Sequence, residues 1–389
     1  MKVAIVLFQK DRGGVDSYLK TLIREWPKSD EIILITNKTN KGIKVLEELI
    51  SEKRIQVRYC PSYDLDAGLL RKIFRFLNLP IYLHFLSLKY RSFVKKFSDH
   101  KIMIQNGTYP GSLDGLAFLK ASRDLGIEKR MMVVHHGAIH GRMRKMFFAS
   151  WVDLSVHQWA TDLVTVSRAT RKTLIDYFGF DPSINPIRVV HNSVQVNGHP
   201  NGKQFLSKTE KDFKLGIVGR VERYKGHEDL IMALSFVDSA KRESISVHIV
   251  GEGHEDEIQR LTKLAENLGV LESITFEGFI PGEACDIISE LDILFMLTKD
   301  FEGFGLTIAE AMSIGTPVIT TRVGAVEEFT NESLVTYVEP ESPRDIAKAI
   351  ENFLKNRDHF LEKSELAKKV ISDYHPTEMV RNYRTLLSV

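Results

Sequence analysis

Two carboxylates eight positions apart mark the part of the sequence best suited to chemistry. Glu302 lies in a glycine-rich turn, Glu310 lies on the helix expected after that turn, and the block ends in a loop at Gly324. The first residues of a helix offer unpaired N–H groups, which form an anion site. A carboxylate beside such a site can bind the hydroxyl groups of a sugar or a ribose. The block therefore predicts a pocket for a sugar joined to a phosphate.

A second cluster is cationic and follows an apolar run of strand type. Gly219 ends this run, and Arg220 and Lys225 come directly after it, before a helical segment. Arginine offers a planar fork to phosphate oxygens, and lysine offers a mobile point charge. The alternative is a solvated turn with ordinary surface charges. Taken together with the Glu302 block, the two cations indicate a site for a diphosphate leaving group.

The first strand of the chain ends in a turn with two adjacent glycines, Gly13 and Gly14, and a helix is expected from about Val15. Glycines let the backbone approach a ligand, and the helix start supplies N–H donors for a phosphate. The spacing differs from the dinucleotide-binding fingerprint, and the chain has no P-loop of the ATPase type. Neither of these two classes is therefore favoured.

Histidines and paired aspartates raise the question of a metal site. His135 and His136 end a predicted strand, and we expect His136 at the mouth of a site and His135 in the packing. His140 is near, but three histidines on a glycine-containing loop do not make a convincing zinc site. The run Asp64-Leu65-Asp66 has the spacing of a metal-chelating motif but precedes a helix, where a loop and helix cap are favoured. We expect no metal.

Apolar β-branched runs alternate with helical segments along the whole chain, which predicts βα units and parallel sheets. In the first half, strands are expected at Val3–Phe8, Glu31–Thr36, Ile55–Tyr59, Lys101–Gln105, Met131–His135, Leu163–Val166 and Ile187–His191. In the second half, they are expected at Phe213–Val218, Ser246–Val250, Ile274–Glu277, Ile293–Leu297, Val318–Thr320 and Val335–Tyr337. Ligands of such sheets bind beyond the carboxyl ends of the strands. We therefore predict an α/β fold of two Rossmann-like, doubly wound domains that face a central cleft.

The length of 389 residues favours two domains over one. We expect an N-terminal domain at 1–196 and a C-terminal domain at 204–374, with a polar linker at Gln195–Lys203 and a last helical segment at 375–389. The first 200 residues hold 31 Lys and Arg against 18 Asp and Glu, and the remainder holds 22 against 33. A basic front half and an acidic rear half indicate different partners for the two domains.

Composition narrows the class of protein. Hydrophobic residues make up 43% and charged residues 27%, which is typical of a globular protein. No apolar run is long enough to span a membrane, and the N-terminus does not have the pattern of a signal peptide. The two cysteines, Cys60 and Cys285, lack metal-type spacing. We therefore expect a cytoplasmic protein.

The stretch Ala67–Ser98 contains no acidic residue, and basic residues alternate in it with aromatic and aliphatic ones. Such a pattern suits an anionic membrane surface, and the basic run at Arg142–Phe148 with Trp151 extends it. The alternative, weighed equally, is that the apolar members pack into the first domain and the basic ones are solvated. Nucleic acid is a weaker interpretation, because no recognised module accompanies the charge.

These motifs stand in one order: the Gly-Gly turn, the histidine at a strand end, GRVERYKG at 219–226, and the two glutamates. This order resembles the family 4 glycosyltransferases, retaining enzymes of the GT-B fold, over nearly the whole chain. The Glu302 block with the following AMSIGTPVI is its most specific part. The sequence departs from the family at Asn192-Ser193, where the family often has Asn-Gly.

The resemblance implies a donor site for a UDP- or GDP-sugar, mainly on the second domain. The catalytic residues that it implies are His136, Glu302, Arg220 and Lys225. The substrate-binding residues that it implies are Gly13, Gly14, Gly219, Gly251, Phe279, Ile280, Phe304, Gly305, Leu306 and Glu310. Arg220 and Lys225 would hold the diphosphate, Glu310 the ribose hydroxyls and Glu302 the sugar, which His136 would also contact. No cofactor is implied besides the nucleotide-sugar co-substrate.

The expected activity is transfer of a hexose-type sugar, with retention and without metal, to a glycan or lipid-linked acceptor. This activity would fit a role in cell-surface polysaccharide synthesis at the inner face of the membrane. The resemblance favours attack from the front face, with the leaving phosphate accepting the acceptor's proton, and domain closure that excludes water. Two alternatives stay open. A nucleotide-sugar 2-epimerase of the same fold would form product from the donor alone, and a non-catalytic module would only bind glycan or lipid.

Overall fold

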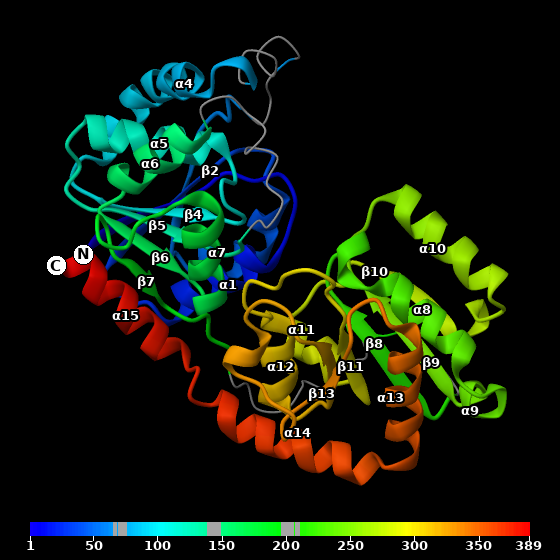
Figure 1. The fold of residues 1–389 in the computed structure, drawn as a ribbon. Coiled ribbons are helices and arrows are strands. Elements are labelled where there is room, and N and C mark those ends of the chain that lie inside the picture. The colour runs from blue at the N-terminus through cyan, green and yellow to red at the C-terminus, as the bar shows by residue number, and fades with distance from the viewer. Residues whose placement is uncertain (65–67, 69–75, 138–148, 196–205, 207–210) are drawn as a thin grey trace. The chain divides into compact units, whose positions relative to one another are not determined.

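The computed structural model describes residues 1–64, 68, 76–137, 149–195, 206 and 211–389. They form two compact units, one made of Met1–Asn192 and Pro376–Val389 and the other of Ser193–His375 (Figure 1). Apart from Gln195, the predicted linker Gln195–Lys203 lies outside the described residues. Each unit contains one parallel sheet and its own hydrophobic core.

The sheet of the first unit has seven strands in the order β3-β2-β1-β4-β5-β6-β7. Its strands are β1 (Lys2–Leu7), β2 (Glu31–Thr36), β3 (Gln56–Tyr59), β4 (Lys101–Asn106), β5 (Arg130–Val134), β6 (Asp162–Thr165) and β7 (Ile187–Val189). All neighbouring strands pair in parallel. Each strand boundary lies within two residues of its predicted position, because continuous apolar runs mark strands that are buried on both faces.

Helices cover both faces of this sheet. They are α1 (Gly14–Glu25), α2 (Glu47–Ser51), α4 (Leu79–Val94), α5 (Leu113–Asp124), α6 (Ala149–Trp159), α7 (Arg168–Phe178) and α15 (Pro376–Ser388), with short 3-10 helices η1 (Lys41–Leu46) and η2 (Lys95–Phe97). Buried side chains of α4, α5, α6 and α7 join one core cluster with the strands. Helices α1 and α15 contact each other, and Tyr18 packs edge-on against Tyr383. The last helix thus belongs to the first unit.

The second unit has a six-stranded parallel sheet in the order β10-β9-β8-β11-β12-β13. Its strands are β8 (Phe213–Val218), β9 (Ile245–Val250), β10 (Ile274–Gly278), β11 (Ile293–Met296), β12 (Val318–Thr321) and β13 (Thr336–Val338). Its helices are η4 (Arg223–Lys225), α8 (His227–Phe236), α9 (Ser239–Glu243), α10 (Glu255–Asn267), η5 (Leu271–Ser273), α11 (Ala284–Ile288), α12 (Leu306–Ile314), η6 (Val326–Glu328), α13 (Pro343–Lys355) and α14 (Arg357–Ile371). Both sheets confirm the predicted α/β architecture.

The described part of the acid-free stretch Ala67–Ser98 divides into two faces, so each of the two interpretations applies to part of it. One set of its apolar side chains is buried in the core of the first unit: Leu79, Tyr82, Leu83, Leu86, Tyr90, Val94 and Phe97. Another set is exposed to solvent: Phe76, Leu77, Ile81, Phe85 and Leu88. The predicted extension at Arg142–Phe148 lies outside the described residues, while Trp151 on α6 is exposed.

Within the part of the chain that the structure describes, no helix combines the length and the apolar character needed to cross a membrane.

Candidate functional site

Two glycines bring the carboxyl ends of β8 and β9 close together. Gly219 and Gly251 have φ angles of +154° and +147°, which residues with a side chain rarely adopt. A Cβ atom on Gly251 would lie only 1.8 Å from the carbonyl oxygen of Gly219. The N–H group of Gly251 donates to the carbonyl of Gly278 at 2.8 Å. Because only glycine fits at this crossing, the turn after β8 starts next to the loop after β9.

The turn after β8 carries the two predicted cations. Arg220 forms an ion pair with Glu222, with 2.7 Å between Nη1 and Oε1, and 45% of the arginine side chain stays exposed. The turn ends at Gly226, which has a φ of +78°. A Cβ atom there would lie 2.2 Å from the carbonyl oxygen of Leu297 at the end of β11. This close approach fixes Lys225 beside the neighbouring strand.

Lys225 and Glu302 form one ion pair across 77 positions of the sequence. Nζ of Lys225 lies 2.7 Å from Oε2 of Glu302, and Thr298 donates its hydroxyl to the same oxygen at 3.2 Å. Both charged side chains are largely buried, at 22% and 13% exposure. Partial burial weakens solvent screening, so this pair is stronger than an ordinary surface pair. The sequence analysis assigned Lys225 to a diphosphate and Glu302 to a sugar, whereas in the structure the two side chains pair with each other.

Tyr224 connects the two ion pairs electrostatically. Burial raises the pKa of this phenol, the carboxylate of Glu222 raises it further, and that of Glu302 does the same. The guanidinium of Arg220 acts in the opposite direction. The pKa of this one phenol thus depends on members of both ion pairs. We therefore describe Arg220, Glu222, Lys225 and Glu302 as a single charged cluster.

The loop after β12 holds the backbone of Glu302. Gly324 has a φ of +60°, and a Cβ atom on it would lie 2.1 Å from the carbonyl oxygen and 2.6 Å from the nitrogen of Glu302. Ala325 donates its N–H to the same carbonyl at 2.9 Å. The sequence indicated a loop at Gly324 but gave no sign of this contact, because the two residues are 22 positions apart.

Helix α12 starts directly after the turn that contains Glu302. Its N-cap is Gly305, at a φ of +95°, and the helix has neither a capping side chain nor an acidic residue in its first turn. The preceding Phe304 stacks on Phe329, with 4.9 Å between ring centroids. Leu306 is the first helical residue, and anion binding at the N–H groups of this helix start stays a prediction.

Glu310 lies on α12, about one turn beyond the helix start. Desolvation raises the pKa of its carboxyl group to about 8, and the nearby Glu283 carboxylate adds to the increase. Part of the residue's surface stays exposed. Among the described residues, no side chain or backbone group forms a hydrogen bond with this carboxyl group. It is therefore ready to bind the hydroxyl groups of a ligand.

The loop after β10 contains the residues predicted near the base of a nucleotide. Gly278 has a φ of +66°, and its carbonyl receives the hydrogen bond from Gly251. Phe279 is 45% exposed, and Ile280 is partly exposed. An aromatic ring open to solvent at the edge of the sheet offers a surface on which a planar group can stack.

In the first unit, a buried carboxylate organises the Gly13-Gly14 turn. Asp16 has no exposed surface; its Oδ2 accepts the N–H of Gly13 at 2.9 Å and its Oδ1 accepts from Gln9 Nε2 at 2.6 Å. Desolvation raises the pKa of Asp16 to about 6. Gly13 itself is extended, at a φ of −171°, a conformation open to any residue. The sequence did not single out Asp16, although an acid at the third position of a helix is a known capping signal.

The two adjacent histidines differ in burial. His135 is buried, its Nε2 lies 2.8 Å from Oε1 of Gln105, and its ring packs edge-on against Tyr18. Desolvation lowers the pKa of His135 to about 3, so its ring is neutral. His136 is partly exposed, and its backbone carbonyl accepts the N–H of Tyr109. His140 lies outside the described residues, and the contact of His136 with a sugar stays a prediction.

Asp64 takes part in a structural network. Its carboxylate accepts the hydroxyl of Tyr82 at 2.9 Å, and its N–H donates to the buried Asp114. Asp114 also accepts the hydroxyls of Ser62 and Tyr90, both at 2.6 Å. These bonds tie the loop after β3 to α4 and α5, whereas the cap of α4 is Asn78. Most residues directly after Asp64 lie outside the described ones, so its expected helix-cap role stays a prediction.

Clusters of three or more metal-ligating side chains are absent from the described residues. Asp66, the other carboxylate of the Asp64-Leu65-Asp66 motif, lies outside them.

Comparison with known proteins follows the division into two units. The family model described as Glycosyltransferase Family 4 matches residues 12–197, and that of Glycosyl transferases group 1 matches residues 200–371. Anabaena Alr3699/HepE, solved in complex with UDP and glucose, has a similar fold, with a TM-score of 0.76. The two proteins are 16% identical, and the alignment covers 100% of this chain and 99% of that one.

Curated relatives are similar over part of their length. A D-inositol 3-phosphate glycosyltransferase of Corynebacterium urealyticum is 30% identical over 44% of this chain and 43% of its own. An O-antigen biosynthesis glycosyltransferase of Escherichia coli, WclY, is 26% identical over 49% of this chain and 53% of its own. The chain spans about half the length of most curated relatives that it matches.

Proposed function

The chain belongs to the family 4 glycosyltransferases and has their GT-B fold, and we propose that it transfers a hexose-type sugar from a UDP- or GDP-sugar with retention of anomeric configuration. The acceptor is a glycan or glycolipid. The observation that carries this proposal is the charged cluster of the second unit, where the Lys225–Glu302 pair adjoins the start of α12. This cluster combines cations, a carboxylate and helix N–H groups, which are the groups needed at a sugar diphosphate.

The cluster suits the charges that develop during transfer. The bond between the anomeric carbon and the diphosphate oxygen breaks, so negative charge grows on that oxygen and positive charge on the sugar. Arg220, Lys225 and the first N–H groups of α12 stabilise the leaving diphosphate by fixed charge and dipoles. The acceptor oxygen attacks from the same face, and its proton passes to a leaving phosphate oxygen. Glu302 holds the sugar through its hydroxyl groups.

Glu310 takes the role of ribose ligand in this proposal. A carboxylate with no hydrogen-bond partner among the described residues can accept hydrogen bonds from two adjacent hydroxyl groups. Its raised pKa, about 8, means that the ionised form gains stability when hydroxyl donors arrive. Donor affinity therefore depends on the protonation of one buried group. Phe279 and Ile280, exposed at the neighbouring strand end, would lie against the base.

Metal independence is part of the proposal, because two cations and a helix start can neutralise a diphosphate between them. Activity measured in excess EDTA should match untreated activity. Full loss of activity in EDTA that manganese restores would contradict this part alone, and the transferase proposal would stand.

In this proposal the first unit binds the acceptor. Its α4 exposes Ile81, Phe85 and Leu88, which stand on one helical face, and Lys89 and Arg91 flank them. Apolar and basic side chains in this arrangement suit an anionic membrane surface. We propose peripheral binding at the inner face of the membrane and a role in cell-surface polysaccharide synthesis. The similarity to an O-antigen biosynthesis glycosyltransferase supports that role.

A two-step experiment tests the function. Thermal shifts with UDP, GDP, ADP and their sugar conjugates identify the donor, since a ligand that binds only the folded chain raises its melting temperature. Transfer of labelled sugar is then measured for the wild type and for Glu302→Gln. We expect transfer that requires an acceptor and falls by roughly 100-fold in the variant. A new nucleotide-sugar formed from the donor alone would establish an epimerase, and full activity of the variant would exclude the proposed site.

A further inference from the structure

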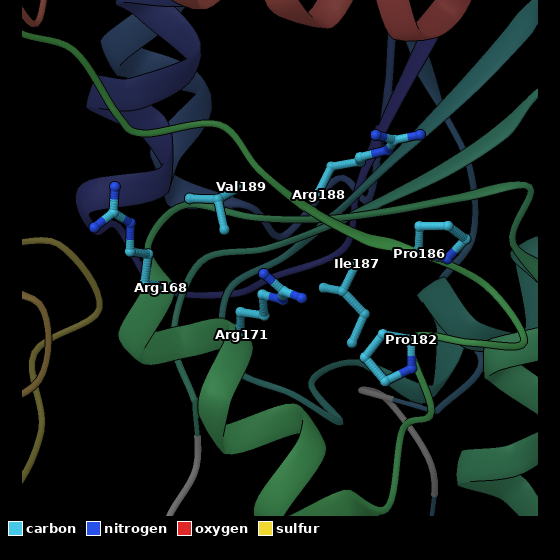
Figure 2. A pocket seen from close by; sticks show the side chains of 7 residues that line it. All are labelled: Arg168, Arg171, Pro182, Pro186, Ile187, Arg188 and Val189. Carbon is cyan, nitrogen blue, oxygen red and sulfur yellow. The ribbon is translucent and has the colours of Figure 1, made fainter.

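A pocket beside the edge strand of the first unit has the chemistry of an anion site. It has a volume of about 470 Å³ and lies between α7, β7 and the segment that joins them (Figure 2). Three arginines and four apolar residues line it: Arg168, Arg171, Arg188, Pro182, Pro186, Ile187 and Val189. None of these lining residues is acidic. The pocket thus combines positive charge with apolar walls.

Arg171 is the central cation of this pocket. Figure 2 shows Arg168 and Arg171 on successive turns of α7, whereas Arg188 projects from β7 with its guanidinium directed away from the helix. The Nε atom of Arg171 is buried and has no hydrogen-bond partner in the described structure. A buried N–H group of a charged side chain that lacks a partner destabilises the fold, because its lost hydration is not replaced. A bound anion would satisfy this donor and offset that cost.

The N-terminal end of α7 carries positively charged side chains, which are unfavourable at the start of an isolated helix. Its first residues include Arg168, Arg171 and Lys172, and its first turn contains no acidic residue. Cations close to the positive end of a helix dipole destabilise the helix. Lys172 pairs with Asp176 of the same helix, with 3.8 Å between Nζ and Oδ2. The sequence therefore maintains positive charge here at a cost in stability, which favours a binding role.

The position of the pocket connects it with the acceptor. Arg168 follows the carboxyl end of β6 and Val189 ends β7, so this side of the pocket lies at the edge where parallel α/β sheets bind ligands, whereas Pro182 and Pro186 lie toward the amino end of β7. We propose that this pocket binds the phosphate ester group of the acceptor, with Arg171 on the phosphate oxygens and the prolines and Val189 against the attached organic group. The glycan or glycolipid acceptor then carries a phosphate ester, either on a sugar or on an isoprenoid lipid. This inference rests on the transferase function proposed above.

The experiment measures binding of phosphate esters to the full chain. The probes are glucose 6-phosphate and farnesyl phosphate, titrated calorimetrically in low salt, and the tighter of the two identifies the organic group. The pocket variants are Arg171→Ala/Arg188→Ala and Arg171→Met, which keeps the apolar stem. Lys172→Ala is the matched control, since it removes one positive charge from the same helix but does not line the pocket. Arg220→Ala/Lys225→Ala removes the cations of the second unit.

We expect the pocket variants to weaken binding of the preferred probe at least tenfold, while Lys172→Ala changes it less than twofold. Arg220→Ala/Lys225→Ala should retain this binding and lose nucleotide binding. Unchanged affinity in the pocket variants, absence of binding by the wild type, or loss only in the Arg220→Ala/Lys225→Ala variant would each overturn the inference. The transferase proposal fails separately, if nucleotide-sugars neither bind nor react while phosphate esters still bind at Arg171.

Discussion

The two units of this glycosyltransferase hold their cations in opposite electrostatic settings. In the second unit, Arg220 is paired with Glu222 and Lys225 with Glu302, each at 2.7 Å. In the first unit, the residues that line the pocket around Arg171 include three arginines and no acid. The first arrangement is nearly neutral before a ligand arrives, and the second carries an excess of positive charge.

This difference shows that the same side chains serve different tasks according to their partners. Under the proposed function, a diphosphate in the second unit would compete with the carboxylates of Glu222 and Glu302 for Arg220 and Lys225. Under the further inference, an anion in the pocket of the first unit would meet no acidic residue in the lining, so charge there would contribute mainly to affinity. Ion pairing thus separates a site for a leaving group from a site for a substrate anchor.

Lys225→Ala provides the strongest test of this comparison. Loss of a cation at the leaving diphosphate should lower kcat by about 100-fold, and by at least tenfold, with the protein still folded. Arg223→Ala is the matched control, because Arg223 lies in the same turn, is 78% exposed and pairs with Glu257 instead. Initial rates of transfer at saturating donor give the readout. Equal rates for the wild type and Lys225→Ala would remove the diphosphate role.

Gly324→Ala tests whether Glu302 must be held by the loop behind it. The new methyl group would collide with the backbone of Glu302, so we expect turnover to fall roughly tenfold and stability to fall by about 1–3 kcal/mol. Gly269→Ala is the control, since Gly269 has a similar φ of +64° but no atom within 4 Å of its Cβ position. Urea unfolding and transfer rates separate the two effects. Similar activity for both variants would argue against this contact.

Excess positive charge in the first unit also predicts membrane binding through α4. Ile81→Ser/Phe85→Ser should lower co-sedimentation with phosphatidylglycerol vesicles about fivefold, since partial insertion of the two side chains contributes roughly 1 kcal/mol in total. Binding of the wild type should weaken as salt rises. Leu361→Ser/Leu366→Ser on α14 removes apolar side chains of similar exposure and serves as control. Absence of vesicle binding by the wild type at any salt, or equal binding of both variants, would contradict membrane binding through α4.

The smallest expected effect is the change of donor affinity with pH that the protonation of Glu310 causes. Its folded-state pKa, about 8, lies above the ordinary value of 4.5, so the folded chain holds a proton that the unfolded chain releases between these values. The contribution of this group to stability is therefore full below pH 4.5 and is lost as pH rises to 8. Donor affinity should change in the opposite direction and rise roughly threefold from pH 7 to 9, because ribose hydroxyls favour the ionised form.

Glu310→Gln checks both parts of this prediction. The variant should show a flatter dependence of melting temperature and of donor KM on pH, because glutamine does not titrate. Thermal unfolding and initial rates between pH 5 and 9 measure these dependences. A wild-type donor KM that is constant across this range would show that Glu310 does not bind the ribose.

Local features of the sequence were sufficient to predict the strands of the fold. Apolar β-branched runs placed every strand within two residues, because a strand buried on both faces must be apolar along its length. Gly219, Gly251 and Gly305, which the resemblance placed at the donor site, have positive φ in the structure. No feature of the sequence indicated that Asp64 accepts a hydrogen bond from Tyr82, because the two residues are 18 positions apart.

The sequence by itself determined the order of strands and helices and the residue types available for chemistry, since both depend on neighbours along the chain. Only the tertiary structure decided which charges pair, which face of α4 is exposed and which carboxyl group is desolvated. Lys225 and Glu302 meet across 77 positions, and Arg171 of α7 lines one pocket with the residues of β7, the next strand of the chain. Such contacts, and the pKa shifts that follow from them, arise from packing between elements that no local pattern encodes.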